Sequence, residues 1–263
     1  MPLLAFDLDG TLIDESTKTH APQLAEQLKT LRQQECKIAL ITGRFVLPPQ
    51  ILDLVQPDAW ALGNGNRIFV ADRCVSRHFL SEIEVQTALD LLGDLKLTVV
   101  GSAITDRPVN FVFDCDDPRW DPGRPGGHIL PLTDMADHDV LHVMFMGEDA
   151  PIMRERLLSA LPDLNVTGGI PPYTDCVNLY ARQAKKHLTL QTIAELLQVS
   201  MDETIAFGDS DNDLEMLQAA GHAVQVGDMP YLNGICQDQV SCPLVGLPEW
   251  LDRFVAQGFQ LKR

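Results

Sequence analysis

The stretch Leu3-Leu4-Ala5-Phe6-Asp7-Leu8-Asp9-Gly10 decides the fold that we predict for this chain. Its apolar first half suits a buried strand, and the Asp-x-Asp-Gly that follows suits a loop at the end of that strand. A second acidic run, Gly208-Asp209-Ser210-Asp211-Asn212-Asp213, follows another apolar stretch much later in the chain. Carboxylates cost too much to bury near one another unless a cation neutralises them. The two runs together therefore predict one site for a divalent metal ion.

The segments around the first run alternate between strand and helix patterns. Residues 22–34 have leucines at helical spacing, and the apolar run 36–41 ends at Thr42-Gly43-Arg44. Strand, helix and strand at this spacing predict a right-handed βαβ unit in a parallel sheet. The same rhythm returns with a helix expected at 186–199 and a strand at 204–207. Both ends of the chain therefore contribute to one sheet.

Thr42 and Lys186 are separated by far more chain than a βα crossover needs. We expect an α/β fold: a Rossmann-like, doubly wound parallel-sheet core with an inserted α+β cap domain. The expected core comprises residues 1–80 and 183–263, and the expected insert residues 81–182. Within the insert, the Pro- and Gly-rich stretch 115–128 predicts a long surface loop, which is either a lid over a site or a plain linker.

Composition restricts the possible partners. The 263 residues include 37 acidic and 20 basic side chains, a formal charge of -17. Such a surface repels nucleic acids and anionic membranes, so neither is expected as a partner. A phosphorylated substrate would be repelled as well, unless the site supplies positive charge locally. No apolar window approaches the ~18 residues of a membrane span, and we expect a cytoplasmic protein, a monomer or weak homodimer.

The acidic runs and Thr42 would meet at one edge of the sheet, because ligands bind at the carboxyl ends of parallel strands. Asp7 has the position of a nucleophile, and Asp9 can direct its carboxyl group to a leaving oxygen. Phosphoryl transfer through an aspartyl-phosphate needs this arrangement. A polar turn is the plainer interpretation of Asp-x-Asp-Gly alone. Calcium loops are disfavoured, because their sixth and twelfth positions would be Leu12 and Lys18, or Leu214 and Ala220.

Taken together, four segments resemble the motifs of the haloacid dehalogenase-like hydrolase superfamily, in that family's order. They are Phe6-Asp7-Leu8-Asp9-Gly10-Thr11-Leu12, Leu40-Ile41-Thr42-Gly43-Arg44, Lys186 at a helix start, and Gly208-Asp209-Ser210-Asp211-Asn212-Asp213. The Thr-Gly-Arg form, the Gly63-Asn64-Gly65 turn and the place of the insert resemble the Cof-type sugar-phosphate phosphatases. The resemblance covers roughly residues 1–80 and 183–263, and the insert matches only in position and approximate content.

This resemblance implies a Mg²⁺-dependent phosphatase acting on a small phosphorylated metabolite, with a sugar phosphate favoured. Asp7 would attack phosphorus, and Asp9 would protonate the departing alkoxide and then activate water. The metal ligands would be the Asp7 carboxylate, the Asp9 carbonyl and Asp209, with Asp213 supporting the metal or Lys186. The implied phosphate or substrate ligands are Thr42, Gly43, Arg44, Lys186 and Asn212.

Several alternatives stay open in the sequence. Lys185 is adjacent to Lys186, and the helical register of Leu190 and Ile193 favours Lys186. Arg44 either binds substrate or pairs with an acidic neighbour. A phosphotransferase or phosphomutase of the same superfamily is the second functional hypothesis, and a catalytically silent metabolite-binding protein is the third. Asp9 favours a phosphatase, because an ester leaving group needs a proton.

Overall fold

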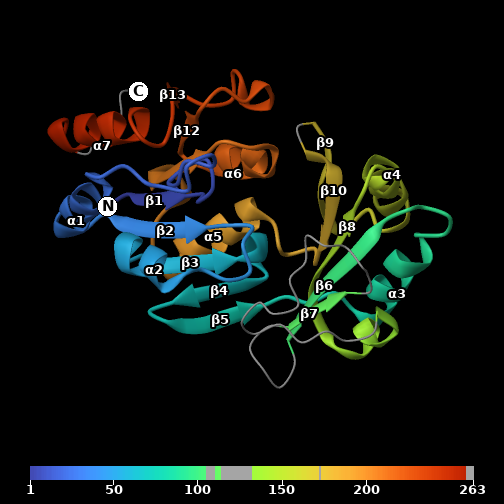
Figure 1. Cartoon of the computed structure of the whole chain (residues 1–263). Coiled ribbons are helices and arrows are strands. Elements are labelled where there is room, and N and C mark those ends of the chain that lie inside the picture. Colours follow the sequence, from blue (N-terminus) through green and yellow to red (C-terminus); the bar gives the residue numbers. More distant parts are fainter. Residues whose placement is uncertain (105–109, 114–131, 172, 259–263) are drawn as a thin grey trace. The chain divides into compact units, whose positions relative to one another are not determined.

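The computed structural model describes residues 1–104, 110–113, 132–171 and 173–258 (Figure 1). The stretch 115–128, expected as a loop, lies outside the described residues. The chain divides into two compact units. The core unit comprises Met1–Arg77 and Lys185–Arg263, and the inserted unit comprises His78–Ala184.

The described part of the core unit contains an eight-stranded sheet in the order β13-β12-β11-β1-β2-β3-β4-β5. Every neighbouring pair from β13 to β3 is parallel, whereas β4 and β5 add to the edge as antiparallel strands. The bounds are β1 Leu3–Phe6, β2 Lys37–Ile41, β3 Ala59–Leu62, β4 Arg67–Val70, β5 Arg73–Arg77, β11 Thr204–Gly208, β12 His222–Val226 and β13 Asp238–Val240. The parallel-sheet core predicted from the sequence is confirmed.

Successive residues of β1 alternate between two apolar layers, as the period of two of a strand requires. Leu4 and Phe6 belong to one hydrophobic cluster, and Leu3 and Ala5 to another. The first cluster includes residues of helices α1 (Leu24–Gln33), α2 (Pro49–Val55) and α7 (Gly246–Ala256). The second includes residues of α5 (Lys186–Leu196) and α6 (Leu214–Ala219). Helices therefore cover both faces of the sheet, which confirms the doubly wound prediction.

Three details of the core unit differ from the sequence prediction. Strands β5 and β13 were not expected; the first alternates between exposed and half-buried residues and the second has three residues. Helix α5 ends at Leu196 rather than at Val199. The backbone of Gln198 is left-handed, with φ 58°, and the Val199 N–H donates to the Ala194 carbonyl. That turn closes the helix early.

The inserted unit contains an antiparallel sheet in the order β7-β6-β8-β10-β9. Helices α3 (Glu82–Asp90) and α4 (Ala150–Ala160) contribute to one apolar cluster with Val143, Phe145 and Leu179 of the sheet. The neighbouring positions His142 and Asn178 alternate to the opposite face. Strand bounds are β6 Thr98–Ile104, β7 Asn110–Phe113, β8 Asp139–Met146, β9 Asn165–Ile170 and β10 Tyr173–Tyr180.

Across the described ranges, every helix is too short or too polar to cross a membrane.

Candidate active site

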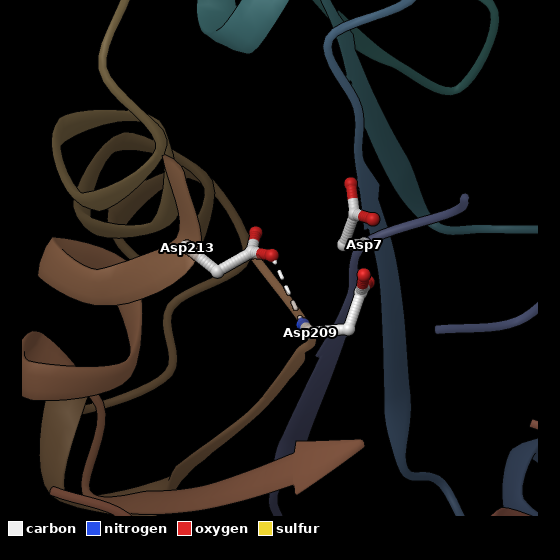
Figure 2. Close-up of side chains that lie close together, drawn as sticks. All are labelled: Asp7, Asp209 and Asp213. Carbon is white, nitrogen blue, oxygen red and sulfur yellow. Dashed lines mark hydrogen bonds between the residues drawn. The ribbon is translucent and has the colours of Figure 1, made fainter. Parts of the chain in front are cut away.

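The two acidic runs meet because their strands are neighbours. Phe6 of β1 pairs with Phe207 of β11 in parallel register, and the Asp7 N–H donates to the Phe207 carbonyl at 3.0 Å. Asp7 and Asp209 therefore leave the same edge of the sheet side by side. Figure 2 shows their carboxyl groups directed toward a shared space that Asp213 also approaches. One carboxylate oxygen from each of the three lies within 4.8 Å of the others.

Lys186 supplies the positive charge at this cluster. It is the first residue of α5, and its side chain is 1 % exposed. The ammonium Nζ lies 2.6 Å from Asp7 Oδ1 and 2.6 Å from Asp213 Oδ1. Lys185, the residue before the helix, is half-buried, and among the described residues the lysine that forms ion pairs with Asp7 and Asp213 is Lys186. Of the two adjacent lysines, the fold brings Lys186 to the acidic cluster.

Both oxygens of Asp213 are occupied by donors of the chain itself. Oδ1 accepts from Lys186, and Oδ2 accepts from the backbone N–H groups of Asp209 and Ser210, each at 3.1 Å. The bond to Asp209 is the dashed line in Figure 2. Asp213 is fully buried. It therefore fixes the loop that carries Asp209 and orients Lys186.

Asp209 is packed against the first motif. The Thr11 hydroxyl donates to Asp209 Oδ1 at 2.7 Å. Gly10 has φ +86°, and a Cβ at that position would lie 2.1 Å from Asp209 Oδ2. Glycine is therefore required at position 10 both by the backbone conformation and by the close approach of the carboxylate.

Asp9 lies outside the acidic cluster and pairs with Arg44. The guanidinium donates from Nε to Asp9 Oδ2 at 2.6 Å and from a terminal nitrogen to Oδ1 at 2.5 Å. This is the bidentate geometry that guanidinium and carboxylate groups prefer. Of the two possibilities that the sequence left for Arg44, the structure contains the pairing with an acidic neighbour.

Thr42 and Gly43 follow β2, the strand next to β1. The Arg44 N–H donates to Thr42 Oγ1 at 3.1 Å. A Cβ added at Gly43 would lie 3.4 Å from Asn64 Oδ1 and 4.0 Å from Asn212 Nδ2. The sequence identified Asn64 only as part of a turn, although an Asn between two glycines directly after a buried strand could have marked it. The end of β3 thus brings a further polar side chain to the loop that carries Thr42.

The electrostatics of the cluster reflect burial among like charges. Desolvation, with the Asp213 charge adding to it and Lys186 opposing it, raises the pKa of Asp7 to about 7. Desolvation and the charges of Asp7 and Asp213 raise the pKa of Asp209 to about 8. Burial alone would lower the pKa of Lys186, but Asp213 and Asp7 raise it above its ordinary value. The site is therefore short of positive charge for three ionised carboxylates.

These residues fit a hard divalent cation. The donor set is made of carboxylate oxygens, which such cations prefer, and a cation would relieve the repulsion that raises the two pKa values. Within the described ranges, side chains bond to only one carboxylate oxygen of Asp7 and one of Asp209, whereas both oxygens of Asp213 accept hydrogen bonds.

The sequence and the fold both resemble known proteins. A family model described as haloacid dehalogenase-like hydrolase matches residues 4–231. An HMP-PP phosphatase of Citrobacter koseri is 27% identical, and the alignment covers 95% of this chain and 96% of the relative. An HMP-PP phosphatase of Klebsiella pneumoniae is 28% identical with the same coverage.

Two solved structures share the fold. The HAD subclass IIB sugar phosphatase BT4131 gives a TM-score of 0.80 at 16% identity, over 99% of this chain and 100% of that one. BT1666 of Bacteroides thetaiotaomicron gives 0.81 at 20% identity, over 97% of this chain and 95% of that one.

Proposed function

The chain belongs to the haloacid dehalogenase-like hydrolases and is a phosphatase, and we propose that it hydrolyses small phosphate monoesters with Mg²⁺ through an aspartyl-phosphate on Asp7. Sugar phosphates are the favoured substrate class. The relatives named HMP-PP phosphatase and the sugar phosphatase with the same fold support a small phosphorylated metabolite.

One observation carries the proposal: the Asp7 carboxylate bonds to Lys186 and lies close to the carboxylate of Asp209. Lys186 Nζ holds one oxygen of Asp7 at 2.6 Å, and the carboxylate of Asp209 lies within 4.8 Å. A carboxylate attacking a phosphate needs positive charge on either side, because nucleophile and substrate are both anions. Lys186 supplies the charge on one side, and a metal held by Asp209 would supply it on the other.

In the proposed first step, the oxygen of Asp7 that Lys186 does not hold attacks phosphorus and the ester P–O bond breaks. Asp9 gives its proton to the departing alkoxide. In the second step Asp9 takes a proton from water, the water oxygen attacks the aspartyl-phosphate, and inorganic phosphate leaves while the Asp7 carboxylate is restored. Lys186 and the Thr42 hydroxyl stabilise charge on the phosphoryl oxygens in both steps.

Asp9 can protonate the leaving group only after its ion pair with Arg44 has been weakened. A proton on Asp9 weakens its bidentate bond to the guanidinium, whose two contacts are 2.6 and 2.5 Å. A substrate phosphate is a competing bidentate partner for Arg44. We infer that substrate binding moves Arg44 from Asp9 to the phosphate and releases Asp9 for proton transfer.

Mg²⁺ would be held by the Asp7 and Asp209 carboxylates and the Asp9 carbonyl, and would polarise the phosphoryl oxygens. Asp213 is assigned to Lys186 and to the 208–213 loop, because both of its oxygens already accept hydrogen bonds there. The inserted unit, proposed as a cap domain, would select the leaving group.

A panel of phosphorylated metabolites, including sugar phosphates and HMP-PP, assayed with Mg²⁺ in ¹⁸O-labelled water tests the proposal. We expect phosphate release that chelator abolishes, with solvent oxygen in the phosphate. Transfer of the phosphoryl group to another hydroxyl without labelled phosphate would indicate the phosphotransferase or phosphomutase instead. Phosphate-dependent binding without turnover of any member would indicate the silent metabolite-binding protein.

A further inference from the structure

Asn64 is held in an unusual conformation by elements of the site itself. Its φ is 58°, a left-handed value that Asn tolerates better than most residues. Its N–H donates to the Thr42 carbonyl at 2.9 Å, and its carbonyl accepts from the Thr189 hydroxyl at 3.0 Å. Thr189 lies in α5, the helix that begins with Lys186. The backbone of Asn64 therefore joins the end of β2 to the lysine-bearing helix.

The side chain of Asn64 is buried without hydrogen-bond partners. The residue is 1 % exposed, and neither amide atom bonds to any residue in the described part of the chain. Buried side-chain amides are nearly always paired, because an unpaired one has lost its water contacts without replacement. The fold maintains this amide in a strained backbone conformation where it gains nothing from the protein. Such a group is typical of a site that awaits a polar ligand.

The amide of Asn64 and that of Asn212 approach the same point beside Gly43. A Cβ added at Gly43 would lie 3.4 Å from Asn64 Oδ1, 3.9 Å from Asn64 Nδ2 and 4.0 Å from Asn212 Nδ2. Asn212 Oδ1 is already engaged by the Ser210 hydroxyl at 2.9 Å, so the Asn212 NH₂ is left to donate. Thr42 Oγ1 accepts from the Arg44 N–H, so its hydroxyl hydrogen is also available. Three donors from three loops suit an oxyanion.

Four adjacent parallel strands bring these groups to one edge of the sheet. In the order β11-β1-β2-β3, the first three strands are followed directly by Asp209, Asp7 and Thr42, and Asn64 is the second residue after β3. Asn64 thus lies at the same edge of the sheet as the proposed nucleophile Asp7 and the proposed phosphoryl ligand Thr42, one strand beyond Thr42.

We propose that Asn64 is a further binding residue of this site, which donates from Nδ2 to a phosphoryl oxygen of the substrate alongside Thr42 and Asn212. This inference rests on the proposed function. Charge is spread over the equatorial oxygens of the phosphoryl group in the transition state, so the bond contributes to turnover as well as to affinity.

Binding of inorganic phosphate in the presence of Mg²⁺, measured by titration calorimetry, tests the inference without depending on turnover. The variant Asn64→Gly accepts φ 58° and removes only the amide. Asn233→Gly, at an exposed position of the core unit, controls for the substitution itself. We expect Asn64→Gly to weaken phosphate binding roughly 10- to 100-fold, the range for one hydrogen bond to a charged group. Asn233→Gly should bind as wild type does.

Thermal stability distinguishes binding from a structural role. Because the amide makes no bond to the described protein, Asn64→Gly should melt no lower than Asn233→Gly. Loss of stability with unchanged phosphate affinity would overturn the inference. Asn64→Asp provides a second variant of the same shape: a carboxylate there should weaken phosphate binding more than glycine does, and retained affinity would also overturn the donor role.

The two proposals fail in different ways. A wild-type protein that releases phosphate from esters while Asn64→Gly keeps wild-type phosphate affinity and kcat/KM would refute only the role of Asn64. A wild-type protein that neither binds phosphate nor hydrolyses any ester would refute the proposed function, and with it the inference.

Discussion

The core unit buries charged groups, whereas the inserted unit buries neutral polar ones. Asp7, Lys186 and Asp213 form an ion cluster in the core unit at 2.6 Å contacts. In the inserted unit, His142 Nε2 bonds to Asn178 Oδ1 at 2.8 Å, and burial lowers the pKa of His142 to about 4, which keeps it neutral. Buried ion clusters usually stabilise a fold less than apolar residues of similar size. We infer from this difference that the core cluster serves the proposed chemistry, whereas the His142 pair serves structure or recognition.

The largest effect should come from Asp7→Asn, which tests whether the core cluster performs the chemistry. We expect phosphate release to fall by at least ~10³-fold, because the amide cannot form the covalent intermediate. Folding should survive, since the pKa of Asp7 is raised by burial and a neutral group costs less there. Steady-state assays with Mg²⁺ measure the effect, with the exposed Asp53→Asn as the control. Full turnover by Asp7→Asn would show that Asp7 is not the nucleophile.

Lys186→Met should combine a functional and a structural loss. The substitution leaves Asp7 and Asp213 buried without their cation, which costs about 3–5 kcal/mol of unfolding free energy, and kcat should fall ~10²- to 10³-fold. Denaturant unfolding at neutral pH measures the first. The matched control Lys185→Met, at the half-buried neighbour, should change stability by less than ~0.5 kcal/mol. Equal effects of the two variants would contradict the choice of Lys186.

Metal binding should offset a loss of folding stability that the core cluster causes as the pH rises. The pKa values of Asp7 and Asp209, about 7 and about 8, exceed their ordinary value of 3.8. The native metal-free protein therefore holds protons that the unfolded chain has lost, and this contribution to stability, complete below pH 3.8, disappears as pH rises through 7 and 8.

Mg²⁺ competes with those protons, so its stabilising effect should grow from pH 6 to pH 8.5. At a hundredfold excess over its Kd, the ion adds about 2.7 kcal/mol. Thermal melts with and without Mg²⁺ across this range measure the increase, and Asp209→Asn should reduce it. If Mg²⁺ raised the melting temperature equally at pH 6 and pH 8.5, the metal would not bind at these carboxylates.

The inserted unit should respond to acid with the opposite sign. Because the native pKa of His142 is lowered from 6.5 to about 4, the unfolded chain binds a proton that the native state excludes. Its contribution to stability is present above pH 6.5 and is lost as pH falls toward 4. Between pH 7 and 5 the loss is about 2 kcal/mol. His142→Gln, which retains an amide able to bond Asn178, should lose less, and equal pH slopes for variant and wild type would show that His142 does not titrate this way.

Much of the core unit could be predicted because its signals are local. Buried parallel strands appear as continuous apolar runs, so β1, β2 and β11 were visible, and the rule that parallel strands end at one edge joined Asp7 to Asp209. The apolar register of α5 selected Lys186, which the structure brings to the cluster. Strands β5 and β13 were missed, because an exposed edge strand and a three-residue strand carry little apolar pattern.

Other features depend on distances that no sequence pattern encodes. The pairing of Arg44 with Asp9 involves two partly exposed side chains that could reach other partners. The Asn64 amide is buried without a hydrogen-bond partner among the described residues only once β2, β3 and α5 have packed together, so the sequence does not reveal it. The polar pair in the inserted unit has no motif, because strand positions 142 and 178 meet only through the antiparallel register of β8 and β10.

The central position of β1 has a consequence for synthesis of the chain. Its neighbours are β2, which follows closely, and β11, which begins at Thr204. A nascent chain emerging from the ribosome can pair β1 with β2 early, but the other side of β1 stays unpaired until residues 204–208 have been made. An open apolar strand edge of this kind invites intermolecular pairing. Fragments that stop before Thr204 should therefore aggregate or engage chaperones, although the entire inserted unit has by then been translated.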